Sequence, residues 1–535
     1  MTSLRLLSRL ALLIVAACTV SLRAATFDLT SASIAEINAA FDAGVLTSEK
    51  LTQLYLARIE AYDKKGPSLR AVMALNPHAL EEARALDAER KTKGPRGPLH
   101  GIPILLKDNI DMVGMPTPAG FYALRDAMPA EDAEQTRRLR AAGCVIIGKT
   151  NMSEFASGAA ISTLGGQMLN PHALDRSPSG SSGGSGAGIA AGYAVFALGT
   201  DTGGSIRGPA AANGIAGLKP TLGLNGRGGI IPLSLSLDTV GPMARNVADL
   251  AAALNVMAGA DPRDPATKEA PTTLIDYTAA LKPDALKGAR LGLLRDYMRG
   301  DPGVEAVIET AIAVLRAHGA EVIEITLPRF VIGLNSGLYT AIRDPEFRYQ
   351  IEDYLGSLPR EDLPKTHAQL IELAEKIKDT TPEGWVRNQD RLNAYKREAK
   401  AGTLEDGPYL SALHDGAKIV RDNLQWFITK EKLDAFIAPT SVRPAGLIKP
   451  PPGGTPSSGS TNGSATQLAN ITGWPDLIVP AGLTSNPRLP VALSFIGPAF
   501  SEARLLALGY AFEQALPVRT LPSTTPPLEG EKFEY

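Results

Sequence analysis

The chain has 535 residues, with 54 Lys and Arg against 56 Asp and Glu, so its formal net charge is −2. That balance gives no electrostatic basis for binding nucleic acid or an anionic membrane surface. Hydrophobic residues make up 44% and charged residues 21%, which is typical of a folded chain with a large core. Two cysteines and six scattered histidines exclude a disulfide framework and a cysteine-rich zinc site, which leaves hydroxyl, carboxylate and amine chemistry.

The N-terminus has the pattern of an export signal. Arg5 and Arg9 precede an apolar run over 10–20, which is too short to span a bilayer as a helix. We expect residues 1–25 to be a signal segment that is cleaved near its end. The mature protein is then periplasmic or secreted and has no transmembrane segment. The stretch that ends at Cys18 also fits a lipoprotein site, and lipidation there is the alternative, with a lipid anchor.

The N-terminal half predicts helices followed by buried strands. Residues 31–62 and 78–92 have helical spacing of apolar residues. The runs 101–106 and 144–148 are continuously apolar, which is typical of strands covered on both faces of a sheet. Each run ends in polar residues, and the first ends at Lys107.

The C-terminal half alternates between sheet-like and helical patterns. We expect a strand–helix–strand unit at 290–327, a charged helical insertion on the substrate side at 340–433 and a long loop at 450–463. After it we expect short strands at 471–498, a last helix at 502–515 and a poorly ordered Pro/Thr-rich tail at 516–535.

The chemistry-bearing segment is rich in glycine and serine, over 177–188 and 199–209. It could be a flexible linker, a phosphate cradle, or a serine nucleophile with backbone N–H groups aimed at an oxyanion. The apolar run 189–198 argues against a linker, and no phosphate-loop or dinucleotide pattern is present. The third interpretation needs a base. Only His172 lies nearby, whereas Lys107 could serve if burial lowers its pKa from about 10.4.

Taken in order, the motifs resemble those of the amidase signature family, the Ser–Ser–Lys hydrolases, over most of the chain. The matching blocks are Gly101-Ile102-Pro103, Leu106-Lys107-Asp108-Asn109, Gly148-Lys149-Thr150-Asn151-Met152-Ser153-Glu154-Phe155, Gly180-Ser181-Ser182-Gly183-Gly184-Ser185, Thr200-Asp201-Thr202-Gly203-Gly204-Ser205-Ile206-Arg207, Gly217-Leu218-Lys219-Pro220-Thr221, Ala438-Pro439-Thr440, Asn470-Ile471-Thr472-Gly473, Pro480-Ala481-Gly482 and Leu489-Pro490-Val491.

The resemblance implies roles for three residues: Ser205 as nucleophile, Ser181 as a bridging serine after a cis peptide, and Lys107 as general base. Ser182 competes with Ser181 for the bridging role because the two are adjacent, and Lys149 is expected to be structural, like Lys219. No cofactor or metal is implied. The resemblance further implies oxyanion donors and organising residues, namely the N–H groups of Thr202, Gly203, Gly204 and Ser205, and the side chains of Ser182, Asp201 and Arg207.

The implied fold is α/β, a large twisted mixed β-sheet flanked on both faces by helices, in a single domain over 26–515. Within the family, residues 34–106 resemble bacterial peptide amidases, so a peptide or other primary amide is the expected substrate. Two alternatives stay open. One is the A subunit of a glutamine-dependent amidotransferase, and the other is a non-catalytic amide-binding protein. The sequence does not indicate the oligomeric state.

Overall fold

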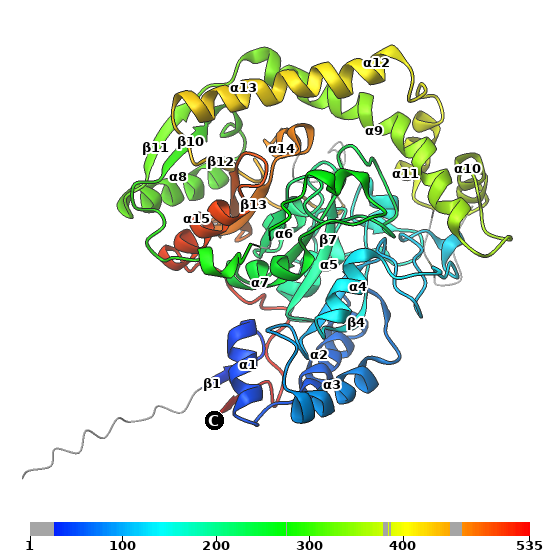
Figure 1. Cartoon of the computed structure of the whole chain (residues 1–535), viewed down its shortest axis with the longest axis vertical. Helices are drawn as coiled ribbons and strands as arrows, with labels where there is room; N and C mark the ends of the chain where they lie inside the picture. Colours follow the sequence, from blue (N-terminus) through cyan, green and yellow to red (C-terminus); the bar gives the residue numbers. More distant parts are fainter. Residues whose placement is uncertain (1–25, 274, 378–383, 385–386, 450–462) are drawn as a thin grey trace, which may run out of the picture.

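The computed structural model describes residues 26–273, 275–377, 384, 387–449 and 463–535 (Figure 1). The predicted signal segment, with Cys18, lies outside the described residues, as does nearly all of the predicted loop at 450–463.

An eleven-stranded mixed sheet runs through the molecule in the order β11-β10-β12-β14-β13-β8-β9-β7-β3-β4-β2. All residues of β3, β4, β7, β8, β9, β12 and β14 are buried, so both faces of the sheet are covered, as the continuous apolar runs predict. The strands are β1 (Thr26–Asp28), β2 (Val72–Leu75), β3 (Pro103–Lys107), β4 (Val145–Thr150), β5 (Ile161–Ser162), β6 (Gly166–Gln167), β7 (Phe196–Asp201), β8 (Ala216–Lys219), β9 (Thr239–Ala244), β10 (Arg290–Leu294), β11 (Glu321–Ile325), β12 (Ala435–Pro439), β13 (Asp476–Leu483), β14 (Pro490–Ile496) and β15 (Lys532–Glu534).

Helices cover the sheet and form a separate layer. Helix α1 begins with a capping box, in which Ser33 and Glu36 each accept from the other's backbone N–H. The helices are α1 (Ile34–Asp42), α2 (Ser48–Ile59), α3 (Ala79–Lys93), α4 (Glu134–Ala141), α5 (Gly183–Ala190), α6 (Arg207–Ala212), α7 (Val247–Met257), α8 (Pro302–Ala317), α9 (Arg329–Ser357), α10 (His367–Lys376), α11 (Gln389–Glu398), α12 (Gly407–Leu410), α13 (Ala417–Lys430), α14 (Thr466–Thr472) and α15 (Glu502–Ala515).

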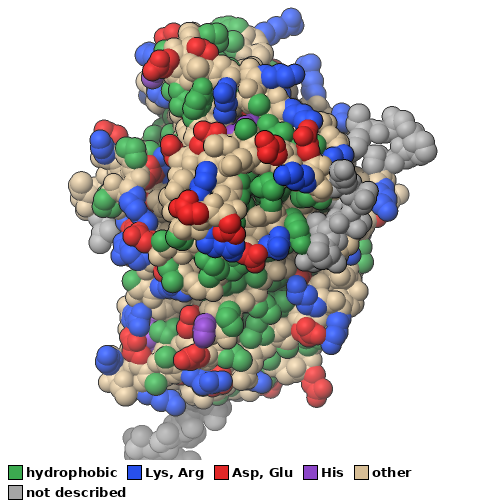
Figure 2. Space-filling model, turned by 90° about the vertical axis from the view of Figure 1, so that its right-hand side faces the viewer, with side chains coloured by type: hydrophobic (Ala, Val, Ile, Leu, Met, Phe, Trp, Pro, Cys, Tyr) green, Lys and Arg blue, Asp and Glu red, His purple; other side chains and the backbone are tan. Residues whose placement is uncertain are grey.

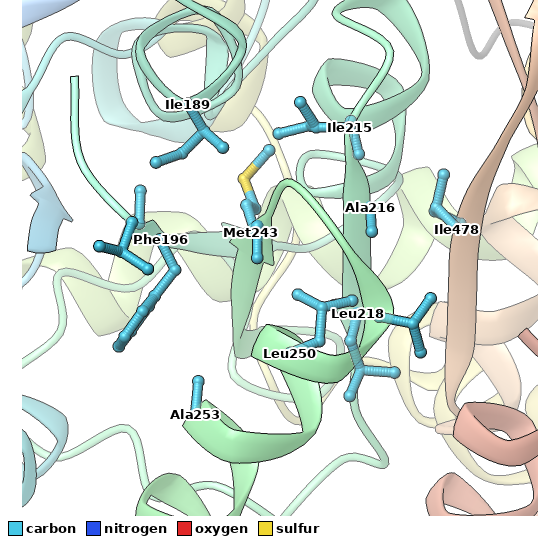
Figure 3. Close-up of a cluster of buried hydrophobic side chains, with 14 of the residues drawn as sticks. Ile189, Phe196, Ile215, Ala216, Leu218, Met243, Leu250, Ala253 and Ile478 are labelled. Carbon is cyan, nitrogen blue, oxygen red and sulfur yellow. The ribbon is translucent and has the colours of Figure 1, made fainter. Parts of the chain in front are cut away.

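The main core lies where helices α5 and α7 pack against the central strands (Figure 3). Phe196 of β7, Met243 of β9 and Ile478 of β13 are fully buried there, with Ile189 of α5 and Leu250 of α7. Because each such side chain contributes about 1.5–3 kcal/mol when removed from water, this packing fixes the sheet edge from which the site is built.

The predicted helical insertion corresponds to helices α9 to α13, which begin earlier than expected, at Arg329. Figure 1 shows α9 and α13 running along the top of the molecule, with α10 and α11 beside the far end of α9. Between helices α9, α10 and α11 and the segment 119–156 lies a further core that is rich in aromatic rings, with Phe155 and Phe347 packed edge to face at 6.0 Å between ring centroids. This layer is therefore packed onto the sheet domain.

The expectation of a poorly ordered tail after residue 515 is wrong. Strand β15 pairs antiparallel with β1, so the two ends of the described chain lie together at the bottom of Figure 1. Glu531 forms a 2.6 Å ion pair with Arg58, and both side chains are inaccessible to solvent. The Pro/Thr-rich composition of the tail did not indicate this contact. A tail can be held in place by a few specific partners although its sequence has no helical or strand periodicity.

The surface carries both signs of charge. On the face shown in Figure 2, Lys and Arg side chains alternate with Asp and Glu side chains and no single-sign patch covers it. Within the described part of the chain, no helix combines the length and apolar character needed to cross a membrane.

Candidate active site

Lys107 is the last residue of β3 and is fully buried. Strand β7 lies parallel to β3, so the carboxyl ends of both strands meet at one edge of the sheet. There Lys107 Nζ lies 2.7 Å from Ser181 Oγ and 2.8 Å from Thr200 Oγ1. Asn109 supports this arrangement, because its side-chain amide donates to Thr200 Oγ1 at 3.1 Å.

The electrostatics of this edge favour a neutral amine. Burial lowers the pKa of Lys107 to about 7, although the carboxylates of Asp201 and Asp238 act in the opposite direction. No carboxylate of the described residues forms an ion pair with Lys107. A lysine with a pKa near 7 is neutral often enough to accept a proton at ordinary pH.

Ser181 follows a cis peptide after Gly180, which agrees with the expectation from the resemblance. Its carbonyl accepts from the N–H of Ser153 at 3.0 Å, and its hydroxyl faces Lys107. The neighbouring Ser182 has a different orientation, since its hydroxyl donates to the Thr200 carbonyl at 3.2 Å. The structure thus brings Ser181, and not Ser182, into contact with the lysine.

The glycine run after Ser182 is not a linker. It forms the buried helix α5, and a Cβ on Gly184 would lie 2.3 Å from the carbonyl oxygen of Asn151 and 2.4 Å from that of Ala71. These glycines are required for close packing of a helix on its neighbours. The resemblance places the oxyanion donors in a different segment, residues 202–205.

Ser205 lies beside Ser182 and is partly exposed. Its carbonyl accepts from the N–H of Ser182 at 3.1 Å, which joins the two serine-bearing loops. Of the four predicted oxyanion donors, the N–H of Gly204 is already engaged by Asp201 Oδ1 at 2.9 Å. Those of Thr202, Gly203 and Ser205 make no hydrogen bond within the described residues, and they remain the candidate donors.

Asp201 and Arg207 form a buried charge pair beneath this loop. Arg207 donates to both carboxylate oxygens of Asp201, at 2.8 and 3.0 Å, and also to Asp476 at 2.9 Å. Burial alone would raise the pKa of Asp201, but Arg207 outweighs it and holds that pKa well below its usual range. The N–H groups of Gly204 and Ile206 donate to the same carboxylate, so the pair fixes the loop that carries Ser205.

Several residues around the site had no role in the sequence prediction. Asp238 accepts from the Thr202 hydroxyl at 2.5 Å, and Asn470 donates to Asp201 at 2.9 Å. The matched motifs contain Thr200, Asn109 and Asn470, so the sequence could have indicated that these residues belong to the site. No motif contains Asp238, so no sequence pattern indicated its role.

Two other buried lysines belong to different surroundings, as expected. Lys149 donates to Thr117 Oγ1 at 3.1 Å, and Lys219 donates to the carbonyls of Pro220 and Trp474 at 2.9 and 2.8 Å. Neither contacts a serine of the site, which leaves Lys107 as the lysine that does.

A cavity of about 670 Å³ opens next to the site between the loop 227–237 and helices α9, α13 and α14. Leu237, Ile342 and Ile471 give it apolar walls, and Asn470 also lines it. Lys107, Ser181 and Ser205 do not line this cavity. Its link to the site is Asn470, which lines it and donates to Asp201.

Comparisons with known proteins agree on the family. The amidase family model matches residues 50–506. The A subunit of glutamyl-tRNA(Gln) amidotransferase from Chloroflexus aggregans is 40% identical over 489 residues, which cover 90% of this chain and 96% of that protein. Native peptide amidase from Stenotrophomonas maltophilia has a TM-score of 0.85 at 40% identity, covering 93% of this chain and 99% of that one. The A subunit of glutamyl-tRNA(Gln) amidotransferase from Thermotoga maritima has a TM-score of 0.72 at 26% identity, covering 93% and 98%.

A large mixed sheet with a lysine and paired serines at one edge defines a hydrolase of amide bonds. The chain belongs to the amidase family. The family predicted from the motifs and the α/β fold are both confirmed, and the protein is an enzyme that acts on carbon–nitrogen amide bonds.

Proposed function

We propose that this enzyme hydrolyses a primary amide, such as the C-terminal amide of a peptide, through an acyl-enzyme on Ser205. The observation that carries the proposal is the 2.7 Å contact between Lys107 Nζ and Ser181 Oγ at a fully buried sheet edge. It supplies a base of suitable pKa and a hydroxyl that can relay a proton.

In the acylation step, Ser205 Oγ attacks the carbonyl carbon of the amide and gives its proton to Ser181 Oγ. Ser181 passes its own proton to neutral Lys107, which becomes an ammonium. The N–H groups of Thr202, Gly203 and Ser205 receive the oxyanion of the tetrahedral intermediate.

In the tetrahedral intermediate, the carbon–nitrogen bond then breaks and the amine side of the amide leaves. Lys107 returns a proton through Ser181 to the leaving group, because an unprotonated amide anion is a poor leaving group. A primary amide releases ammonia in this step, and the acyl group stays on Ser205 as an ester. Water attacks that ester with Lys107 and Ser181 again accepting the proton, and the carboxylic acid departs.

The choice of a peptide amide is supported by the comparisons and by the cavity. The same 40% identity links the chain to a peptide amidase and to an amidotransferase component, so sequence identity does not separate the two. The TM-score is higher for the peptide amidase, 0.85 against 0.72. A 670 Å³ cavity with apolar walls has room for side chains on the acyl side of a peptide.

The second candidate is the A subunit of a glutamine-dependent amidotransferase, favoured by the identity with the Chloroflexus protein. Such a protein would release ammonia from glutamine for a partner. The near-neutral charge gives no basis for contact with tRNA by this chain itself.

A substrate panel separates the two. Purified protein without partners is offered peptide amides, aryl amides, fatty amides, esters and glutamine, with ammonia or amine release as the readout. We expect peptide amides to be hydrolysed fastest and Ser205→Ala to abolish turnover while the circular dichroism spectrum is unchanged. Exclusive use of glutamine, with turnover stimulated by copurifying proteins, would favour the amidotransferase role.

We further propose that the protein is exported to the periplasm or secreted, on the basis of the N-terminal pattern of residues 1–25. N-terminal sequencing of protein expressed in a Gram-negative host tests this. Cleavage near residue 25 supports a mature form without an anchor, a lipid adduct on Cys18 supports anchoring, and an intact N-terminus in the cytoplasm contradicts both.

A further inference from the structure

Helix α9 presents one face to the loops of the active site. Tyr339, Arg343 and Glu346 stand at positions i, i+4 and i+7, so they share one side of the helix. Each of the three contacts a different loop, and each of these loops adjoins the serines or Lys107.

Tyr339 covers the loop 202–205, which carries the candidate oxyanion donors and is called the oxyanion loop below. A Cβ built on Gly203 would lie 2.9 Å from the hydroxyl and ring of Tyr339, so the ring lies directly on that glycine. One turn further on, Arg343 donates to Ser157 Oγ at 2.9 Å. Ser157 ends the turn that begins at Ser153, whose N–H holds the Ser181 carbonyl.

Glu346 makes the most extensive contact. This buried carboxylate accepts from the Ser234 hydroxyl at 2.6 Å, from the Ser236 N–H at 3.0 Å and from the Tyr409 hydroxyl at 2.8 Å. The Ser236 hydroxyl donates to it as well. Such a set of donors is sufficient to hold a buried carboxylate without a cation, and it fixes the loop 233–238 to α9.

The loop 233–238 ends in Asp238, which faces the site. Its carboxylate accepts from the N–H groups of Leu233 and Ser234 and from the Thr202 hydroxyl. The charged and titratable groups around it are Lys107, Arg227 and Tyr339. The negative charge of Asp238 acts on Lys107 against the effect of burial.

We propose that Glu346 is a positioning residue for amide hydrolysis: from helix α9 it holds the loop 233–238 so that Asp238 orients Thr202 in the oxyanion loop and faces Lys107. This inference rests on the proposed Lys–Ser–Ser function. It assigns to the helical layer a direct part in the alignment of the site, in addition to any part in substrate binding.

The test is the rate of Ser205 modification by a fluorophosphonate in the full chain, measured from pH 5 to 9 for wild type, Glu346→Ala and Glu346→Gln. We expect Glu346→Ala to lower the maximal inactivation rate constant by about 10- to 100-fold, because small misplacements at a reacting centre have effects of this size. The acid limb of the profile should move to lower pH, since release of Asp238 removes a charge that raises the pKa of Lys107. Glu346→Gln, which keeps an acceptor oxygen, should recover part of the rate.

Glu372→Gln on α10 is the matched control, because that side chain is exposed, and its profile should equal that of wild type. If Glu346→Ala does not fold, Ser236→Ala is used in its place, because it removes one hydrogen-bond donor to the Glu346 carboxylate. A lowered melting temperature with an unchanged rate constant and acid limb would overturn the positioning role alone. Failure of the wild type to be labelled at Ser205 would instead overturn the proposed function and, with it, this inference.

Discussion

Lys107 is a buried lysine whose nearest polar partners are hydroxyl groups. In this environment the effect of burial, which lowers the pKa of the amine, outweighs the opposite effect of Asp201 and Asp238, so the amine titrates near neutrality. The ion pair with Arg207 holds the pKa of Asp201 well below its usual range, and Asp201 accepts from the N–H groups of Gly204 and Ile206 in the loop that carries Ser205. The site therefore combines a lysine that titrates near neutrality, the proposed base, with a carboxylate that stays ionised at neutral pH.

The pH dependence of hydrolysis follows from the pKa of Lys107. Because this pKa is lowered to about 7, the neutral amine is present above pH 7 and is lost as the pH falls below it. We expect kcat/KM to decrease about tenfold per pH unit below this value, because kcat/KM reports groups of the enzyme without substrate. In Lys107→Ala, the residual rate should be lower and should lack this acidic limb. An unchanged limb in the variant would assign the base to another group.

The three residues that we propose to react, Lys107, Ser181 and Ser205, could be named from the sequence because each stands in a dense motif. Asp238 and Glu346 were not, because their roles arise from contacts between segments that are distant in sequence and have ordinary local composition. Sequence patterns report periodicity and local chemistry, whereas a carboxylate held by donors from a loop 110 residues away leaves no local trace.

At the level of elements, the parallel pair β3 and β7 brings Lys107 to Thr200. The turn that leads into the glycine-rich helix α5 brings Ser181 to Lys107. The buried strands were predictable from continuous apolar runs. The helix was not, because glycine has poor helix propensity and only tertiary packing favours it here. The contact that demands glycine is with the backbone of Asn151 and Ala71.

Gly184→Ala tests that packing. The added methyl would lie within 2.4 Å of two carbonyl oxygens, so the free energy of unfolding should fall by about 1–3 kcal/mol or more, and activity should fall with it. Gly356→Ala, near the end of α9, meets no atom within 4 Å and should stabilise by about 0.5–1 kcal/mol. Chemical denaturation of both variants is the measurement, and equal stabilities would contradict the packing role of α5.

The C-terminal tail also acts as a structural element. Removal of the Glu531 carboxylate in Glu531→Ala leaves the Arg58 guanidinium buried without its ion pair, which should lower the free energy of unfolding by about 3–5 kcal/mol. Glu529→Ala, at an exposed position of the same tail, should leave the melting temperature unchanged. A melting temperature in Glu531→Ala that equals that of Glu529→Ala would show that the tail is dispensable.

At the scale of the whole molecule, scarcity of cysteine and histidine is consistent with a site built from lysine, serine and backbone. The family and the mixed sheet were predictable, because an ordered set of motifs spans most of the chain. The sequence predicted a helical insertion on the substrate side, but not the docking of α9 onto particular loops of the site. It depends on how a charged, irregular segment folds back over residues that lie more than a hundred positions earlier.

The central claim is that Ser205 is the nucleophile of a Lys–Ser–Ser amidase. Its most direct test is mass-spectrometric mapping of the purified protein after treatment with a fluorophosphonate at pH 8. We expect a single adduct on the peptide that contains Ser205, formed in step with the loss of amide hydrolysis and absent in Ser205→Ala. An adduct on a different serine, or full activity after stoichiometric labelling of Ser205, would contradict it.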